Sequence, residues 1–221
     1  MKMPSNRYPF IAREAWPFLF FVFGLAVLAQ FLIGASASIV LLLIFVVFVY
    51  LFRDPTREIP SEPLAVVSPV HGVITLIEEA EEIHPHAKTI RVQINMRAHD
   101  IYSLRGPIEG KVMEQWCSST DKNESRRHFD FHIKSDEGDD VVTAIRLRDV
   151  IRKFHVYMHS GERIGQGQRG GYIYFGGLVD VFLPIESKVK VEVGQYVESG
   201  SSVLAHIIHS KAASVIQDED N

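Results

Sequence analysis

Residues 174–184, Tyr-Phe-Gly-Gly-Leu-Val-Asp-Val-Phe-Leu-Pro, decide how the rest of the chain is interpreted. The pattern predicts a strand, a break at Gly176-Gly177, and a second strand over Leu178–Leu183 that ends at Pro184. Two adjacent glycines inside a strand pattern indicate a sharp bend, or a group that approaches the backbone closely. A β-bulge or a tight barrel corner is the structural interpretation, and a functional site at the break is the alternative.

From residue 64 onward the chain consists of short β-type runs separated by Gly, Pro, Asn and Asp. This spacing predicts a domain that is all or nearly all β. In Lys188–Val193, strict alternation predicts three valines buried on one face and charges on the other. The predicted strands are Val73–Ile77, Thr89–Ile94, Lys111–Trp116, Phe129–Ile133, Val141–Leu147, Lys153–Met158, Tyr172–Phe175, Leu178–Leu183, Lys188–Val193 and Val203–Ile208.

Two apolar runs, Trp16–Ile33 and Ile39–Phe52, lie near the N-terminus and are separated by the short break Gly-Ala-Ser-Ala-Ser at 34–38. Each run is slightly shorter than the roughly 20 residues that span a bilayer. The pattern predicts a two-helix transmembrane hairpin over residues 16–52. A signal peptide would share the basic start, but the second apolar run argues against one. A single re-entrant or kinked helix is the other alternative.

Basic residues flank the hairpin on both sides, and its loop carries no charge. The positive-inside rule therefore predicts both ends in the cytoplasm, with the β domain on the cytoplasmic side of the inner membrane. We expect a cytoplasmic N-terminus (1–15), the hairpin (16–52), a linker (53–64), the β domain (65–210) and an acidic tail (211–221). The flanking basic residues are Lys2, Arg7, Arg13, Arg53 and Arg57.

Net charge and cysteine content exclude some classes of function. The formal net charge is −4, so the sequence predicts no nucleic-acid partner. A single cysteine, Cys117, excludes an internal disulfide and a thiolate metal cage, and fits a domain that faces a reducing compartment.

The segment around the double glycine resembles the C-terminal signature of the short phosphatidylserine decarboxylases, which reads Phe-Gly-Ser-Arg-Val-Asp-Val-Tyr-Leu-Pro. The resemblance rests on Gly161–Ile164, Gly167, Arg169, Gly171 and Phe175–Pro184. It implies a lipoyl-like barrel-sandwich (hammerhead) fold and a place in phospholipid metabolism, where such enzymes form phosphatidylethanolamine.

In that family the serine hydroxyl attacks the carbonyl of the preceding glycine, and the resulting ester eliminates. The serine thereby becomes an N-terminal pyruvoyl group, which is the electron sink for decarboxylation. In this chain the serine position is Gly177. Glycine has no hydroxyl, so a pyruvoyl group cannot form at this bond, and we expect no cofactor.

Two further family positions also differ. The family's aspartate lies in Ser-Pro-Ala-Asp-Gly, which corresponds to residues 68–72 with His71 in place of the aspartate. Its histidine lies in His-Val-Asn-Arg-Ala-Pro, which corresponds to residues 102–107 with Tyr102 in place of the histidine and with Arg105 and Pro107 matching. Loss of the nucleophile, its base and the orienting carboxylate leaves no activated nucleophile.

These differences predict a pseudoenzyme that does not cleave itself and has a lipid-binding or regulatory role. The phospholipid headgroup site would be formed by Gly176, Gly177, Arg105, His71 and Tyr102. The expected partners are the phospholipid membrane and either an active decarboxylase or a second copy of this chain. The alternatives are a decarboxylase with a rebuilt site, a metal-dependent hydrolase and a membrane-tethered scaffold.

Three other groups of residues could carry chemistry. Alternation places His128, Asp130 and His132 on one strand face, where they could hold a divalent metal, although a wet polar strand face has the same pattern. His99-Asp100 could be an acid–base pair, but neighbours on a strand point to opposite faces. Gly200-Ser201 is a second Gly-Ser pair, for which a polar turn is the alternative.

Overall fold

In the computed structural model of the protein, the described residues are 10–55, 58–81, 88–119, 127–147 and 154–208. The chain forms two compact units, Met1–Arg57 and Glu58–Asn221.

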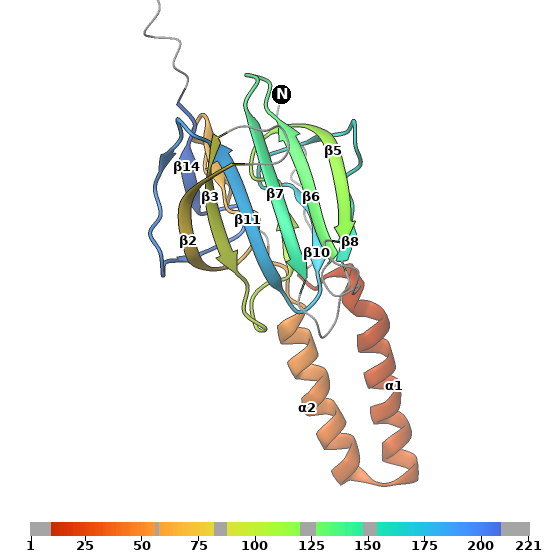
Figure 1. Cartoon of the computed structure of the whole chain (residues 1–221). Coiled ribbons are helices and arrows are strands. Elements are labelled where there is room, and N and C mark those ends of the chain that lie inside the picture. Colours follow the sequence, from red (N-terminus) through yellow and green to blue (C-terminus); the bar gives the residue numbers. More distant parts are fainter. Residues whose placement is uncertain (1–9, 56–57, 82–87, 120–126, 148–153, 209–221) are drawn as a thin grey trace, which may run out of the picture. The chain divides into compact units, whose positions relative to one another are not determined.

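The first unit is a helical hairpin (Figure 1). A 3-10 turn, η1 (Arg13–Ala15), leads into α1 (Trp16–Leu32), and α2 (Ala35–Leu51) follows after a turn at Ile33 and Gly34. Gly34 has φ of 114°, a conformation that favours glycine. On α1 the buried side chains are Leu19, Ala26 and Ala29, a spacing that forms one stripe along a helix.

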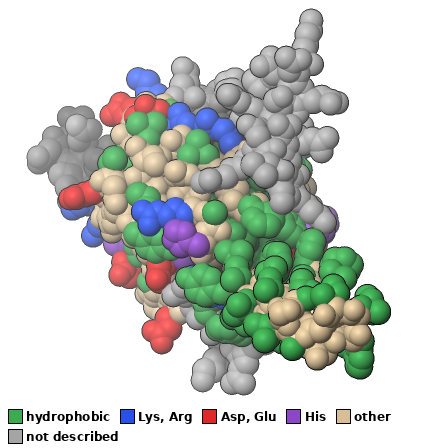
Figure 2. Space-filling model, turned by 90° about the horizontal axis from the view of Figure 1, so that it is seen from below, with side chains coloured by type: hydrophobic (Ala, Val, Ile, Leu, Met, Phe, Trp, Pro, Cys, Tyr) green, Lys and Arg blue, Asp and Glu red, His purple; other side chains and the backbone are tan. Residues whose placement is uncertain are grey.

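The two ends of the hairpin are joined at its base. Ile11 and Arg53 form an isolated antiparallel bridge. The N–H of Ala12 donates to the carbonyl of Phe52 at 3.0 Å. No charged residue occurs between Trp16 and Phe52, and Figure 2 shows the apolar side chains of the hairpin from below. Among the described residues, one helix, Arg13–Leu32, is long and apolar enough to cross a membrane, and α2 is shorter.

The second unit contains three antiparallel sheets (Figure 1). The orders are β1-β14-β12, β4-β10-β8 and β13-β2-β3-β11-β7-β6-β5-β9. The strands are β1 (Ala65–Val67), β2 (Gly72–Glu81), β3 (Lys88–Asn95), β4 (Ser103–Arg105), β5 (Gly110–Ser119), β6 (Arg127–Lys134), β7 (Asp140–Leu147), β8 (Phe154–Val156), β9 (Arg163–Ile164), β10 (Arg169–Ile173), β11 (Gly177–Pro184), β12 (Lys188–Val189), β13 (Tyr196–Val197) and β14 (Val203–His206).

The eight-stranded sheet curls into a half-barrel around the core, and β11 lies near its middle. This strand pairs with β3 on one side and with β7 on the other. Val179, Val181 and Leu183 are fully buried on the inner face, as the period-two pattern requires. Asp180 alternates with them and therefore points to the outer face.

The prediction of a mostly β domain after two helices is confirmed, and the finer assignment to a lipoyl-like barrel-sandwich stays a prediction. The prediction of a strand over Lys188–Val193 is wrong beyond its first two residues, because β12 consists of Lys188 and Val189 alone and the chain leaves β14 after one further hydrogen bond, from the N–H of Lys190 to the carbonyl of Leu204. The chain then turns, so that Val191 is buried while Val193 is 61% exposed. Four strands of two or three residues, β1, β4, β9 and β13, were too short to be predicted.

Candidate functional site

The predicted break is a tight turn between β10 and β11. The N–H of Gly176 donates to the carbonyl of Ile173 at 3.4 Å. Phe175 has φ of 59° and Gly176 has φ of 76°, so two consecutive residues are in the left-handed region. This region is unfavourable for a bulky residue such as Phe175. A Cβ on Gly176 would lie 3.0 Å from that of Met96, which leaves little room for a side chain.

Gly177 is the first residue of β11, and its main chain has a neighbouring segment on each side. Its carbonyl accepts a hydrogen bond from the N–H of Met96 at 3.0 Å, and it lies opposite Leu147 of β7. A Cβ at this position would lie 2.6 Å from the main-chain carbonyl oxygen of Arg146. Gly177 itself has no hydroxyl. Because the obstacle is a main-chain atom, which cannot rotate away as a side chain can, the position also lacks room for the Cβ that would bear one.

Tyr102, at the family's histidine position, is fully buried among aromatic rings. Its ring meets that of Tyr172 edge to face at 5.9 Å between centroids, and that of Phe175 at 5.8 Å. Its hydroxyl donates a short hydrogen bond to the carbonyl of Ala98. Tyr102 therefore packs against the strained residue of the turn and ties down the loop that follows Met96.

His71, at the family's aspartate position, is 2% exposed. Its Nδ1 accepts a hydrogen bond from the N–H of Ser199 at 3.4 Å. The next residue, Gly72, is so close to β3 that a Cβ would lie 2.5 Å from the carbonyl oxygen of Asn95. Asn95 is the last residue of β3, and it precedes Met96, whose N–H donates to the carbonyl of Gly177. The segment that carries His71 is therefore connected to Gly177 through Asn95 and Met96.

Arg105 lies at the end of β4 and is 4% exposed. Its N–H donates to the carbonyl of Pro69 at 2.8 Å, which places it against the segment that carries His71. Its guanidinium Nη1 donates to the carbonyl of Gly167 at 3.1 Å. The five predicted site residues are therefore joined by short chains of contacts, and all of them are buried.

An ion-pair network on the outer face of β11 was missed by the sequence analysis. Asp180 is fully buried. Its carboxylate accepts hydrogen bonds from Arg91 at 3.1 and 3.2 Å, from Gln93 at 2.8 Å, and a short one from Arg146. The alternation of polar residues on Thr89–Ile94 and around Asp180 was the available signal.

This network affects both the electrostatics and the strand positions. Burial by itself would lower the pKa of Arg91, but hydrogen bonds and charges from Asp180 and Glu78 outweigh it and raise the pKa above its ordinary value. Asp180 binds arginines from β3 and β7, and so holds these strands against β11. The same residue of β7, Arg146, places its carbonyl over Gly177.

The predicted metal group is only partly described. His132 Nε2 lies 2.7 Å from the Oδ1 of Asp140. The side chain of His128 lies outside the described residues, and among those described no three His, Cys, Asp or Glu side chains are placed to hold a metal ion. The metal prediction therefore stays untested.

The other two candidates lie in turns. Asp100 is 2% exposed and its carboxylate accepts bonds from the N–H of Arg97 at 2.6 Å and the hydroxyl of Tyr196 at 3.0 Å, whereas His99 is exposed. Ser201 donates to the carboxylate of Glu198 at 3.4 Å, also within a turn.

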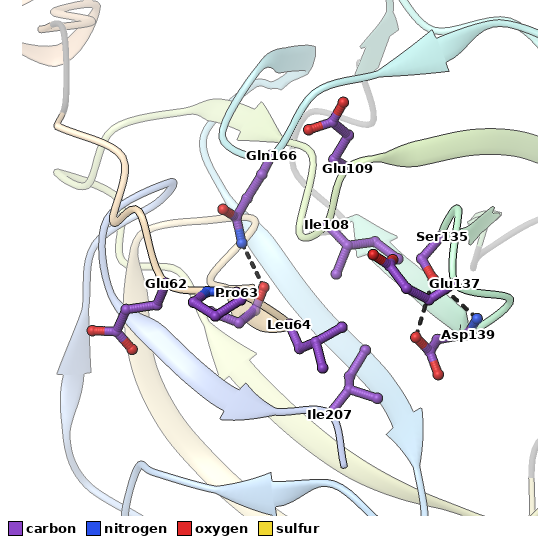
Figure 3. A pocket seen from close by; sticks show the side chains of 11 residues that line it. Glu62, Pro63, Leu64, Ile108, Glu109, Ser135, Glu137, Asp139, Gln166 and Ile207 are labelled. Carbon is purple, nitrogen blue, oxygen red and sulfur yellow. Dashed lines mark hydrogen bonds between the residues drawn. The ribbon is translucent and has the colours of Figure 1, made fainter. Parts of the chain in front are cut away.

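A cleft of about 240 Å³ opens elsewhere in the second unit (Figure 3). Part of its wall is the turn between β6 and β7, at the end of β7 opposite to Leu147. Since β7 has eight residues, about 24 Å of strand separates the cleft from Gly177. Its lining combines acidic and apolar side chains and includes none of the five predicted site residues: Glu62, Pro63, Leu64, Ala65, Ile108, Glu109, Ser135, Glu137, Asp139, Gln166 and Ile207.

Comparisons with known proteins match most of the chain to the family that its motifs resemble. Residues 44–205 match the family described as phosphatidylserine decarboxylase. The phosphatidylserine decarboxylase proenzyme of Nitrosomonas europaea is 32% identical over 214 residues, which cover 93% of this chain and 99% of the relative. The proenzyme of Paraburkholderia xenovorans is 30% identical over 208 residues, covering 90% and 98% respectively. No solved structure matches the chain.

Proposed function

The chain belongs to the phosphatidylserine decarboxylase family, and from that premise we propose that it acts in phospholipid metabolism without cleaving itself and without a pyruvoyl group. One observation carries the proposal. Gly177, at the position of the family's serine, has no hydroxyl, and the carbonyl of Arg146 lies 2.6 Å from where its Cβ would be. The residues present therefore do not fit the pyruvoyl group of the family.

The two companion positions support this proposal. The hydroxyl of Tyr102 is already bonded to a main-chain carbonyl, and the ring is enclosed by aromatic neighbours. The hydroxyl of a free tyrosine has a reference pKa far above that of histidine, so tyrosine is in general a poor base at neutral pH. His71 accepts a hydrogen bond through Nδ1 where the family has a carboxylate. Neither residue supplies the base that an acyl shift needs.

The hairpin supports a place at the membrane. Its helices are apolar on all sides, and the charges nearest to it, Arg13, Glu14, Arg53 and Asp54, lie together at its base. With this distribution of basic residues, the protein is anchored in the inner membrane with both ends of the hairpin on the cytoplasmic side.

The role that fits these features is regulation of phospholipid synthesis through an active decarboxylase, bound as a partner, or through self-association. The second candidate is binding of a phospholipid headgroup at the site around Gly176 and Gly177, and one observation favours it. Among the described residues, the buried hydroxyls of Ser103, beside Tyr102, and of Ser199, beside His71, have no hydrogen-bond partner. Buried hydroxyls of this kind are normally satisfied, and a lipid headgroup could bond them.

The intact mass of the purified full chain under denaturing conditions tests whether the chain cleaves itself. A single species of full length is expected, whereas the Nitrosomonas europaea relative, which is named a proenzyme, serves as the control for processing. Two fragments, of which the smaller resists N-terminal sequencing, would refute the proposal. Release of carbon dioxide from phosphatidylserine vesicles by the uncut chain would instead refute a purely regulatory or lipid-binding role.

Binding of short-chain phospholipids to the full chain separates the two roles. If the site binds a headgroup, phosphatidylserine should bind more tightly than phosphatidylcholine, and Ser103→Ala and Ser199→Ala should each weaken it. Equal, weak binding of all headgroups, together with co-purification of an active decarboxylase, would favour the regulatory role.

A further inference from the structure

The helices of the hairpin are short for a membrane-crossing element. Both α1 and α2 have 17 residues, which correspond to about 26 Å at 1.5 Å per residue. The hydrocarbon core of a typical bilayer is about 30 Å thick. The three residues of η1 that precede α1 include Arg13 and Glu14, which belong with the headgroups. Counted over the α-helical residues alone, each arm is therefore about 4 Å shorter than the hydrocarbon core, even before any tilt. The 20-residue span Arg13–Leu32 reaches full length only by including the charged residues of η1.

The base of the hairpin is anchored at the level of the headgroups. Trp16 begins α1, and Tyr50 lies in the last turn of α2. The Arg53 guanidinium lies 4.1 Å from the centroid of the Tyr50 ring, and its Nη1 donates to the Tyr50 carbonyl at 2.9 Å. Tryptophan, tyrosine and arginine favour this boundary, so the base does not sink into the hydrocarbon to make up the missing length.

The turn at the other end also needs polar surroundings. The N–H groups of Ile33 and Gly34 both donate to the carbonyl of Ala29, at 2.9 and 3.0 Å. The first N–H groups of α2 and the last carbonyls of α1 require partners that a helix end cannot supply itself. The N-cap of α2 is Gly34, which has no side chain to donate or accept. Such backbone is excluded from hydrocarbon, so the turn must reach headgroups or water.

From these opposing requirements we infer that the hairpin spans the bilayer with its turn in the far headgroup layer, and that it therefore binds thin membranes in preference to thick ones. This rests on the proposed membrane association. Transmembrane helices tilt by about 20° on average, and those longer than the bilayer is thick accommodate the excess by tilting. This hairpin has no excess length, so it must stand upright and thin the lipid around it. Its partner surface is a bilayer whose hydrocarbon thickness is about 26 Å.

The test uses the full chain with Cys117→Ser and Ser36→Cys, which places one exposed thiol beside the turn. The protein is added to preformed vesicles of phosphatidylcholine and phosphatidylglycerol with myristoleoyl, oleoyl or erucoyl chains. A membrane-impermeant maleimide is trapped inside the vesicles, and flotation measures binding. Labelling should be about tenfold greater in the thinnest vesicles than in the thickest, because the free-energy cost of spanning grows with each ångström by which the bilayer exceeds the hairpin.

A matched variant carries one extra heptad of apolar residues in each helix, which keeps the spacing of the contact stripe. Its labelling should be greatest in thicker vesicles. Equal labelling of the unmodified hairpin at every thickness would overturn the thickness preference. Flotation without labelling in any vesicle would overturn the spanning geometry. Absence of flotation would instead overturn the proposed membrane association, and with it this inference.

Discussion

Adding a single carbon at Gly177 tests whether this position is closed. In Gly177→Ala the new Cβ would lie 2.6 Å from the carbonyl oxygen of Arg146, which is 0.8 Å less than the 3.4 Å at which ordinary contacts begin. Because β7 is held by its ladder with β11 and by the pairing of Arg146 with Asp180, the strand cannot move away freely. Overpacking of this kind costs about 1–3 kcal/mol.

Thermal unfolding of the detergent-solubilised full chain measures this cost. For a chain of this size, 1 kcal/mol shifts Tm by about 2–4 °C, so Gly177→Ala should lower Tm by about 2–12 °C. Gly165→Ala is the matched control. Its Cβ would meet only the side chain of Gln168, at 3.3 Å from Oε1 and 3.8 Å from Cβ, and no main-chain atom, so its effect on stability should stay within about 0.5 kcal/mol.

Gly177→Ser adds the family's nucleophile to the same position. It should destabilise the chain at least as much as Gly177→Ala and should still yield one full-length species by intact mass, because Tyr102 and His71 supply no base. Two results would refute the reasoning. One is Gly177→Ala with the stability of the parent chain, which would mean that the position is open. The other is self-cleavage of Gly177→Ser, which would mean that only the hydroxyl was missing.

Three further substitutions have defined outcomes. Asp180→Asn leaves two arginines without their carboxylate and should lower the free energy of unfolding by about 2–3 kcal/mol, less than a fully buried pair because both arginines are partly exposed; an unchanged denaturant midpoint would contradict the role given to this network. Tyr102→Phe keeps the ring and loses the hydrogen bond to Ala98, so a loss of about 1 kcal/mol is expected in the same assay, with a larger loss for alanine at this position. The hydrogen bond and charge of Arg163 hold the pKa of Asp136 below its ordinary value, so the stability from this exposed pair is present at neutral pH and lost as the pH falls through that lowered pKa; the Tm difference between the parent chain and Asp136→Asn should therefore shrink in acid.

Several parts of the fold follow from local pattern. Alternation over Thr89–Ile94 and Leu178–Leu183 predicted the two strands that build the centre of the large sheet, and both are present as β3 and β11. Lys188–Val193 has an equally clear pattern and forms only a two-residue strand. The N–H of Lys190 still donates to the carbonyl of Leu204 in β14, but the chain then leaves β14 and turns between Glu192 and Gln195. A strand needs a neighbour along its whole length, and alternation alone does not show where the chain leaves that neighbour.

The site was predictable only as a set of positions. Flanking motif residues made His71, Tyr102 and Gly177 recognisable, because each is a change within a matched segment. The obstacle at Gly177 comes from Arg146, about 30 residues away along the chain, and depends on the register between β11 and β7. The aromatic packing of Tyr102 likewise depends on the turn conformation of Phe175. Such long-range geometry is absent from local periodicity.

The bond between Gly176 and Gly177, which we propose stays uncut, bears on how the molecule refolds after denaturation. It joins β10, in a three-stranded sheet, to β11, which pairs on both sides within the eight-stranded sheet. A chain cut at this link would have to bring two separate polypeptides together again after denaturation, at a rate set by their concentration. In a chain that stays whole, the central strand is always tethered to its neighbours. For such an uncut chain, refolding is expected to be unimolecular, at a rate that does not depend on protein concentration.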